Sequence, residues 1–217
     1  MSLAVTFTAP IITGNLLVLG VVRLATATLS GVTDSLGNTW TQGATANINN
    51  TKLEMWYVGG SLSGSNTVTV AGTLSTADAI GFAASYTQIT QAPPPYDQIA
   101  TNTVTATSIT VGPVTTTQNS ELAVMLVGLV DAANFLSNVS VGWSVRFIKN
   151  NGSSGTRMMF LDRSLNAIGS YSGTVGFLQS GDGSGIIMTF KKVATGSLAF
   201  GEPIIYTKPA NVRASFY

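Results

Sequence analysis

The stretch Gly14-Asn-Leu-Leu-Val-Leu-Gly20 recurs in kind, 106 residues further on, as Ser120-Glu-Leu-Ala-Val-Met-Leu126. The apolar runs that overlap these stretches extend from Leu16 to Val22 and from Leu122 to Val130. Neither run approaches the roughly 20 apolar residues of a membrane-spanning helix. Both are apolar at odd and even positions, unlike a strand with one buried face, in which apolar and polar side chains alternate. We therefore expect two equivalent strands, each buried on both faces.

Four further pairs of segments repeat in the same order, at offsets between 103 and 107 residues. Such a constant offset indicates two pseudo-equivalent halves, near residues 10–90 and 110–192, with about five strands each. The pairs are Trp40 with Trp143, Leu53–Tyr57 with Arg157–Phe160, Ser65–Thr69 with Ser172–Gly176, and Ile80–Ala84 with Ile186–Phe190.

The pattern predicts an all-β protein, because runs of β-branched residues are separated by Gly, Asn, Ser and Pro, and helix signals are nearly absent. Five strands in each half could form two small barrels. We favour one antiparallel, jelly-roll-like β-sandwich of about ten strands over residues 1–197. If each half is a single sheet, it has a hydrophobic face, and packing the two sheets face to face buries both hydrophobic faces. The Pro-rich stretch Gln91–Asp97 would join the halves. In such a two-layer sandwich, an arm, a loop or another subunit must cover the second face of the doubly apolar strands.

Residues 198–217 lie outside the repeat and read as a C-terminal docking arm. Pro203 and Pro209 interrupt regular pairing, and the aromatic content is too high for plain disorder. We expect the arm to bury its apolar side chains against the parent domain or a neighbouring copy, through Phe200, Ile204, Ile205, Tyr206 and Phe216.

Composition excludes much chemistry. The 217 residues include no Cys and no His, which removes disulfides, thiolate nucleophiles, Cys/His zinc sites and histidine catalysis. Ten Lys and Arg against nine Asp and Glu give a net charge of +1, so a nucleic-acid partner is not expected. No basic residue precedes Arg23, so no secretion signal is indicated. We expect no cofactor, no metal and no membrane contact.

The carboxylates are scattered singly along the chain. A glycosidase needs two of them about 5–9 Å apart, and the sequence indicates no such pair. Glu54, next to Lys52, is expected on a solvent-facing side of a strand. Gly181-Asp-Gly-Ser-Gly185 is expected to be a hairpin tip, because a strand follows it where a phosphate site needs a helix, and one carboxylate is too few for calcium.

Two of the three tryptophans, Trp40 and Trp143, are repeat-equivalent, which favours core positions for both. Trp56 has the parity opposite to Leu53, Met55 and Tyr57 and is expected to face outward. We favour an interface role for Trp56. A sugar-stacking platform that includes Tyr96 is the alternative.

The chain resembles the β-sandwich structural proteins of tailed bacteriophage virions, namely cement or decoration proteins and related head or tail accessories. The resemblance is carried by Gly14–Val22, by Val32-Thr-Asp-Ser-Leu-Gly-Asn-Thr-Trp-Thr41 and by Ser63-Gly-Ser-Asn-Thr-Val-Thr-Val70. The resemblance is one of general sequence pattern, it covers residues 10–192, and it assigns no functional residue. It implies a homo-oligomer that binds a capsid or tail lattice protein.

Three hypotheses follow. The first is a non-enzymatic virion protein, assembled in the host cytoplasm, that acts as a capsid cement or decoration protein. Thr, Ser and Gly make up 74 of the 217 residues, so its surface would be rich in hydroxyl groups, and its desolvation in an interface would cost little free energy. The second is a carbohydrate- or receptor-binding module of a tail fibre or of a secreted, extracellular adhesin, with a glycan as partner. The third is a glycan-cleaving or esterase-like enzyme.

Overall fold

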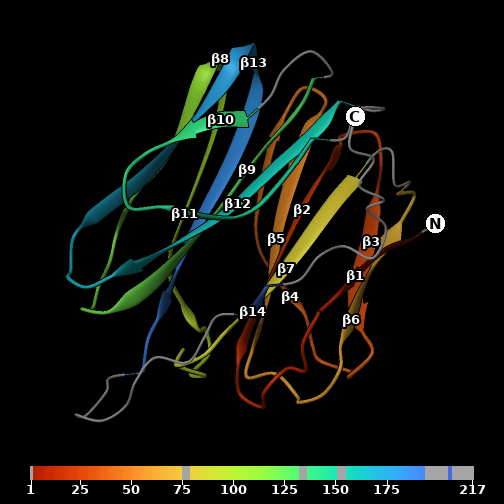
Figure 1. Ribbon diagram of the computed structural model, residues 1–217, viewed down its shortest axis with the longest axis vertical. Coiled ribbons are helices and arrows are strands. Elements are labelled where there is room, and N and C mark those ends of the chain that lie inside the picture. The colour runs from red at the N-terminus through yellow and green to blue at the C-terminus, as the bar shows by residue number, and fades with distance from the viewer. Residues whose placement is uncertain (1, 75–78, 132–135, 151–154, 194–204, 207–217) are drawn as a thin grey trace.

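The structure, a computed structural model of the chain, describes residues 2–74, 79–131, 136–150, 155–193 and 205–206 (Figure 1). These residues form fourteen β-strands and no helix, so no helix among them could cross a membrane. All strand pairs are antiparallel. The prediction of an all-β, antiparallel fold is confirmed, and the strands outnumber the ten or so expected.

The first half forms one inner sheet and one outer layer. The inner sheet has the order β7 (Ala79–Tyr86), β2 (Leu16–Leu24), β5 (Thr51–Gly59) and β4 (Thr41–Ile48), with the short β14 (Ile205–Tyr206) beside β7. The outer layer has the order β1 (Ser2–Thr6), β6 (Thr67–Gly72) and β3 (Leu29–Asp34). Its apolar side chains pack on the outer face of the inner sheet, where Val5, Val68 and Val70 join one cluster with Leu17, Leu19 and Val21.

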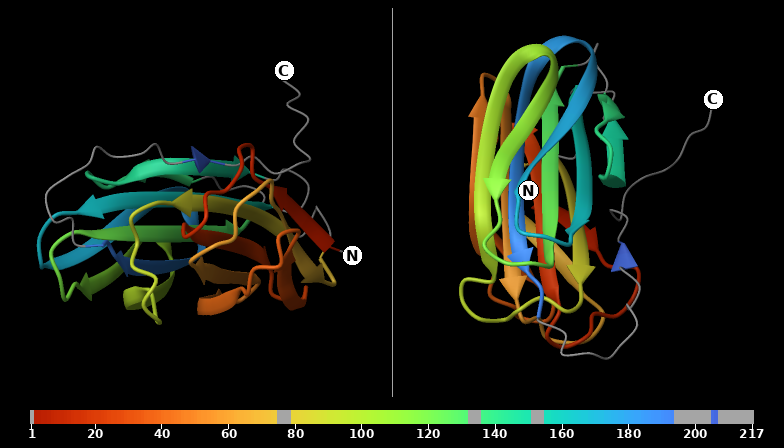
Figure 2. Two further views of the ribbon diagram at one scale, coloured as in Figure 1. Left: turned by 90° about the horizontal axis from the view of Figure 1, so that it is seen from below. Right: turned by 90° about the vertical axis from the view of Figure 1, so that its left-hand side faces the viewer.

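The second half builds both of its layers from one sheet. β13 (Ser170–Lys191) pairs with β9 (Glu121–Val130), which pairs with β12 (Thr156–Leu165) and so with β11 (Ser144–Asn150). β8 (Tyr96–Thr115) pairs with β13 over most of its length. β10 (Leu136–Val139) pairs with the first part of β13. Figure 2 (right) shows β8 and β13 arching over together at the top of the molecule. Past the arch they form an outer layer with β10.

The two halves share one strand order. In the inner sheets, β7-β2-β5-β4 corresponds to β13-β9-β12-β11, where the part of β13 concerned is residues 181–191. In the outer layers, β1-β6-β3 corresponds to β8-β13-β10, through residues 109–115 of β8 and 170–177 of β13. Apart from the two tryptophans, each pair of segments matched in sequence lies in, or begins just before, corresponding strands. Trp40 and Trp143 precede β4 and β11, and each is 8% exposed.

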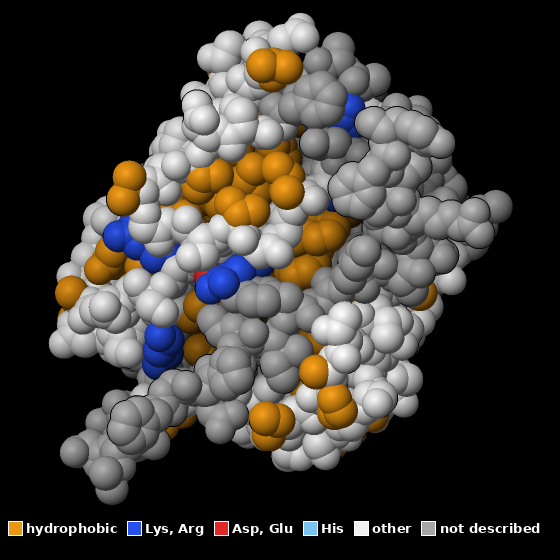
Figure 3. Space-filling view, in the orientation of Figure 1, with side chains coloured by type: hydrophobic (Ala, Val, Ile, Leu, Met, Phe, Trp, Pro, Cys, Tyr) orange, Lys and Arg blue, Asp and Glu red, His pale blue; other side chains and the backbone are white. Residues whose placement is uncertain are grey.

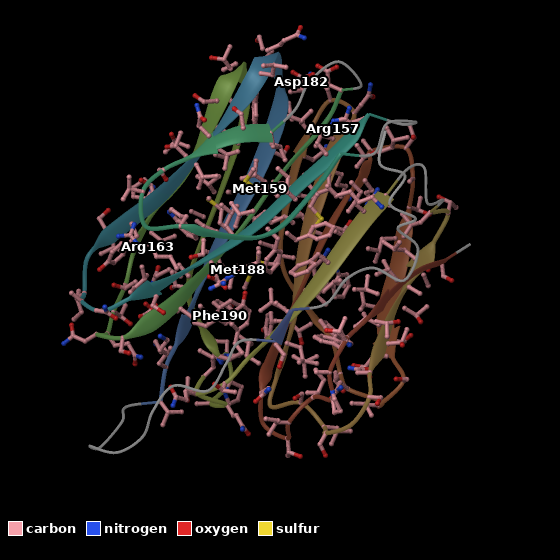
Figure 4. All side chains as sticks on the ribbon, viewed as in Figure 1. Arg157, Met159, Arg163, Asp182, Met188 and Phe190 are labelled. Carbon is pink, nitrogen blue, oxygen red and sulfur yellow. The ribbon has the colours of Figure 1, made fainter. Side chains whose placement is uncertain are left out.

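The inner sheets pack face to face through the largest hydrophobic cluster, as expected. From the first half it contains Val18, Met55 and Phe82, and from the second half Phe160, Met188 and Phe190. Figure 4 shows Met188 and Phe190 near the middle of the molecule, on the part of β13 that faces the first half. Phe82 of β7 stacks on Phe147 of β11, with ring centroids 4.7 Å apart, which adds an aromatic contact between the halves.

The doubly apolar strands are buried as predicted, but the cover differs from the expectation. The outer face of β2 lies beneath β1, β6 and β3, and that of β9 beneath the outer parts of β8, β13 and β10. Each half therefore covers its own strand, and the stack has four layers instead of two. No arm or second subunit is needed for this purpose, because both covers come from strands adjacent in sequence.

The structure describes the predicted turn at Gly181–Gly185 and two of the predicted docking residues. Gly181–Gly185 is not a hairpin tip, because these residues lie inside β13 and pair with Ala106–Asn102 of β8. Beside them the register shifts between Gly176 and Gly181, where β13 passes from the outer to the inner layer, and glycine accommodates such a bend. Of the expected docking residues, Ile205 and Tyr206 pair with Ser85 and Ala84 of β7, on the parent domain. The other three lie outside the described residues: Phe200, Ile204 and Phe216.

Candidate functional site

Titratable groups and a cavity coincide at the lower end of β13 in Figure 1, where the chain passes from the first half to the second. A pocket of about 550 Å³ opens here. Its walls come from three segments: the junction before β8, the turn before β9, and the end of β13. The lining residues are Thr90, Ala92, Pro93, Pro94, Tyr96, Asp97, Gln118, Lys191, Lys192 and Val193.

Backbone hydrogen bonds fix these three segments to one another. The amide of Thr90 donates to the carbonyl of Lys191 at 2.8 Å, and the amide of Val193 donates to the carbonyl of Gln88 at 2.8 Å. Gln118 adds a side-chain tie, because its Nε2 donates to the carbonyl of Lys192 at 3.1 Å. The prolines of the junction donate no backbone hydrogen bond, so the neighbouring amides and side chains hold this stretch.

Asp97 is the ionised carboxylate of the pocket. Its side chain is 3% exposed, and burial by itself would favour the neutral acid. Thr117 outweighs this, because its amide donates to Oδ2 at 2.7 Å and its hydroxyl donates to Oδ1 at 2.6 Å. Lys191 Nζ lies 3.0 Å from Oδ1. Together these donors lower the pKa of Asp97 to about 2.

Glu121, the first residue of β9, lies beside Asp97 and is completely buried. Among the described residues, none lies in hydrogen-bond geometry to donate to its carboxyl oxygens. Burial raises the pKa of this carboxyl, and the charge of Asp97 adds to the effect. The neutral form of Glu121 is therefore favoured more strongly than in a solvent-exposed glutamic acid, next to a carboxylate, Asp97, that is held ionised by its own donors.

The two lysines of the pocket differ in their partners. Lys191 pairs with Asp97, whereas Lys192 Nζ donates to the hydroxyl of Ser164 at 3.1 Å. Burial lowers the pKa of Lys192, and the charge of Asp162 opposes that shift without forming an ion pair. Asp162 instead accepts hydrogen bonds from Arg146 Nε at 2.7 Å and from the Tyr86 hydroxyl at 3.2 Å. Lys192 thus gives the pocket a surplus positive charge.

The placement of Asp97 and Glu121 differs from that of the two carboxyl groups of a glycosidase. A glycosidase holds its two carboxyl groups about 5 Å or more apart, to flank a scissile bond. Asp97 and Glu121 are instead hydrogen-bonding neighbours, and both are buried. Over the described residues, no cluster of three or more acidic side chains could hold a metal ion.

Sequence analysis singled out Tyr96 but missed the rest of this site. Asp97 and Glu121 are 24 residues apart in the chain and meet only because β8 and β9 both flank β13. One signal was present. Glu121 is the single charged residue of a strand that is otherwise apolar throughout, and such a residue needs a specific partner inside the fold.

Trp56 does not stand on a free surface. It is half-buried, it packs against the outer cluster of the first half, and its indole Nε1 donates to Glu54 Oε2 at 3.3 Å. Glu54 was expected in solvent and is instead 3% exposed, with Arg23 Nη2 at 2.7 Å from its Oε1. The predicted parity is present, because Trp56 lies on the face of β5 opposite to the inner cluster. The outer layer of the first half covers that face, so Glu54 is buried instead of solvated.

Both outer layers present an almost uncharged surface. Their six strand segments contain one charged side chain, Asp34, which accepts hydrogen bonds from Trp40 and from Asn38 and Asn66 of its own half. Figure 3 shows one face of the molecule, on which white surface alternates with orange hydrophobic patches, several blue side chains are visible and red is nearly absent. Exposed hydroxyl groups occur on both layers, at Ser30, Thr33, Thr110, Thr115, Ser137 and Ser172.

No family model, no curated protein and no solved structure matches the chain.

Proposed function

We propose that the protein is a non-enzymatic structural component of a bacteriophage particle, with a capsid cement or decoration protein as the leading form. The observation that carries the proposal is the uncharged, hydroxyl-rich surface of the two outer layers. Protein interfaces are depleted of charge at their centres, and a surface without Lys or Glu loses little hydration or rotamer freedom when it is covered.

The body behind these surfaces suits the same role. Three hydrophobic clusters, one between the inner sheets and one beneath each outer layer, tie four layers into one unit. A protein that clamps a lattice must hold its contact surfaces at a fixed separation. Since neither half needs a partner to cover its apolar strands, assembly would use the finished outer surfaces. We propose the same surfaces for contacts between copies in a homo-oligomer.

The proposal is tested by mass spectrometry of purified virions from the source, which should contain the protein in stoichiometric amounts. A matched pair of variants then tests the surface. Thr110→Lys with Thr115→Lys places charge on the second outer layer and should remove the protein from particles. Thr101→Lys with Thr103→Lys charges an exposed part of β8 before the arch and should leave incorporation unchanged. Absence of the native protein from virions would refute the proposal.

A carbohydrate-binding module is the second candidate, and the pocket at the junction favours it. Tyr96 contributes an aromatic ring, Pro93 and Pro94 contribute an apolar wall, and the polar groups Thr90 and Gln118 border them. Sugar sites combine such apolar surfaces with a few fixed polar groups. Presence in host secretions instead of virions would favour this candidate.

A further inference from the structure

The pocket at the junction contains one more positive than negative charge. Its charged lining residues are Asp97, Lys191 and Lys192. Asp97 and Lys191 neutralise each other at 3.0 Å. Glu121, behind them, is completely buried and is not among the lining residues. Lys192 therefore remains as a cation with no carboxylate at ion-pair distance among the described residues.

Lys192 retains donors for a ligand. An ammonium group has three N–H donors, and one of them is directed to Ser164 at 3.1 Å. The nearby carboxylate that could compete, Asp162, is already occupied by Arg146 and Tyr86. A partly buried cation in this state favours an anionic group over water, because its own hydration is incomplete.

The rest of the lining selects the body to which that anion is attached. The volume of about 550 Å³ falls in the range of small-molecule sites and exceeds what a bare inorganic anion would fill. Pro93 and Pro94 provide apolar surface, on which the C–H face of a sugar ring can stack. Tyr96 adds an aromatic side chain to the lining and is held there by an edge-on contact with Tyr57, at 5.9 Å between ring centroids. Thr90 and Gln118 provide hydrogen-bonding groups beside that surface.

We infer that this pocket binds a carboxylate-bearing sugar, such as a uronic acid residue of an acidic polysaccharide, with Lys192 as the partner of the carboxylate and Tyr96 beneath the ring. The inference rests on the carbohydrate-binding candidate and is independent of membership in a particle. Asp97 acts as a positioning residue, because it keeps Lys191 engaged at 3.0 Å and leaves Lys192 to the ligand.

Titration of the full chain with D-glucuronate, D-glucose and acetate, followed by NMR, tests the inference. Glucuronate should bind at least about tenfold more tightly than either of the others, since glucose lacks the charge and acetate lacks the ring. Lys192→Met should weaken glucuronate binding by about tenfold or more, and Lys192→Arg should preserve it. Lys52→Met, which removes a cation on β5 outside the pocket lining, is the matched control and should change nothing.

Each other outcome overturns the inference. Equal binding of glucose and glucuronate would leave the carbohydrate-binding candidate intact and refute the anion site. Equal binding of acetate and glucuronate would show a bare anion site without sugar recognition. Absence of binding by all three, or a folded Lys192→Met variant with unchanged affinity, would remove the site altogether. A folded Tyr96→Ala variant with unchanged affinity would refute stacking, and it covers the case in which Lys192→Met fails to fold.

Discussion

Gly20 of β2 lies against Leu126 of β9, and these two residues occupy the same place in the two halves, 106 positions apart. A Cβ added to Gly20 would lie 3.0 Å from Leu126 Cδ1. The reverse pair is also present, because Gly128 of β9 faces Val22 of β2, again 106 positions apart. The inner sheets thus meet about an approximate two-fold axis, with a small residue opposite a large one on each side.

We expect Gly128→Ala to destabilise the protein by about 1–3 kcal/mol, the usual cost of overpacking a core. The added Cβ would lie 2.6 Å from Val22 Cγ1 and 3.0 Å from the carbonyl oxygen of Arg157, and neither group can move easily. Gly20→Ala should cost less, because its new contacts lie at 3.0 Å or more, the two nearest are with the ends of the flexible side chains Leu126 and Met158, and the Phe160 ring follows at 3.1 Å. Urea unfolding of both variants measures the difference.

Val22→Ala introduced with Gly128→Ala supplies the control. The double variant should be more stable than the sum of the single losses predicts, because the shortened Val22 makes room for the new methyl group. Strict additivity would mean that the two residues are not coupled.

The buried ion pair between Arg23 and Glu54 gives a second prediction. Glu54→Gln should destabilise the protein by about 3–5 kcal/mol, because it leaves the Arg23 guanidinium buried, at 3% exposure for the residue, without its counter-charge. Arg23→Met combined with Glu54→Gln should recover part of the loss. If the double variant were less stable than Glu54→Gln alone, charge burial would not be the cause.

Asp97 and Glu121 predict opposite dependences of stability on pH. The pKa of Asp97 falls from 3.8 to about 2 on folding, so its contribution is present above pH 4 and is lost as the pH falls toward 2. The pKa of Glu121 rises on folding, so its neutral form favours the folded state, and stability declines as the pH rises above 4.5. Denaturation curves measured between pH 2 and pH 8 should show both limbs.

Two variants separate the limbs. Asp97→Asn should flatten the acid limb, and Glu121→Gln should flatten the decline at higher pH because an amide does not titrate. If both limbs persisted in both variants, other groups would be responsible.

The two equivalent tryptophans should respond differently to removal of the indole N–H. Trp40 Nε1 donates to the carboxylate of Asp34 at 2.9 Å, and Trp143 Nε1 donates to the backbone carbonyl of Ser172 at 3.1 Å. Hydrogen bonds to charged groups contribute about 1.5–3 kcal/mol and neutral ones about 0.5–1.5. Trp40→Phe should therefore cost more than Trp143→Phe in a chemical denaturation series, and equal losses would contradict the assignment.

The fold class followed from the sequence because strand periodicity and the repeat are local signals. The offset of 106 residues already related β2 to β9 and β7 to the last part of β13. The four-layer arrangement was not predictable in the same way. Nothing in the alternating outer strands indicates that they cover their own half, so the sequence predicts a solvated Glu54 where the structure has a buried one.

The site was harder to predict than the fold, because it depends on pairing between distant strands. Tyr96 and the junction prolines were visible in the sequence, but the significance of Asp97 arises only when β8 and β9 flank β13 and bring Glu121 beside it. Lys192 likewise acquires its character from burial next to Ser164 and Asp162, which lie about 30 residues away in the chain.

The passage of β13 from one layer to the other has a mechanical consequence. In the second half, β8 and β13 each run without interruption through both layers, so the outer layer can separate only if two long strands break their pairing together. In the first half, the strands that correspond to the two parts of β13, namely β6 and β7, are separate elements. The two outer layers should therefore differ in their resistance to mechanical unfolding and in the protection of their amides from hydrogen exchange. The first outer layer, a sheet of three short strands, would unfold locally without disturbing its inner sheet. The second outer layer would unfold only together with the inner parts of β8 and β13.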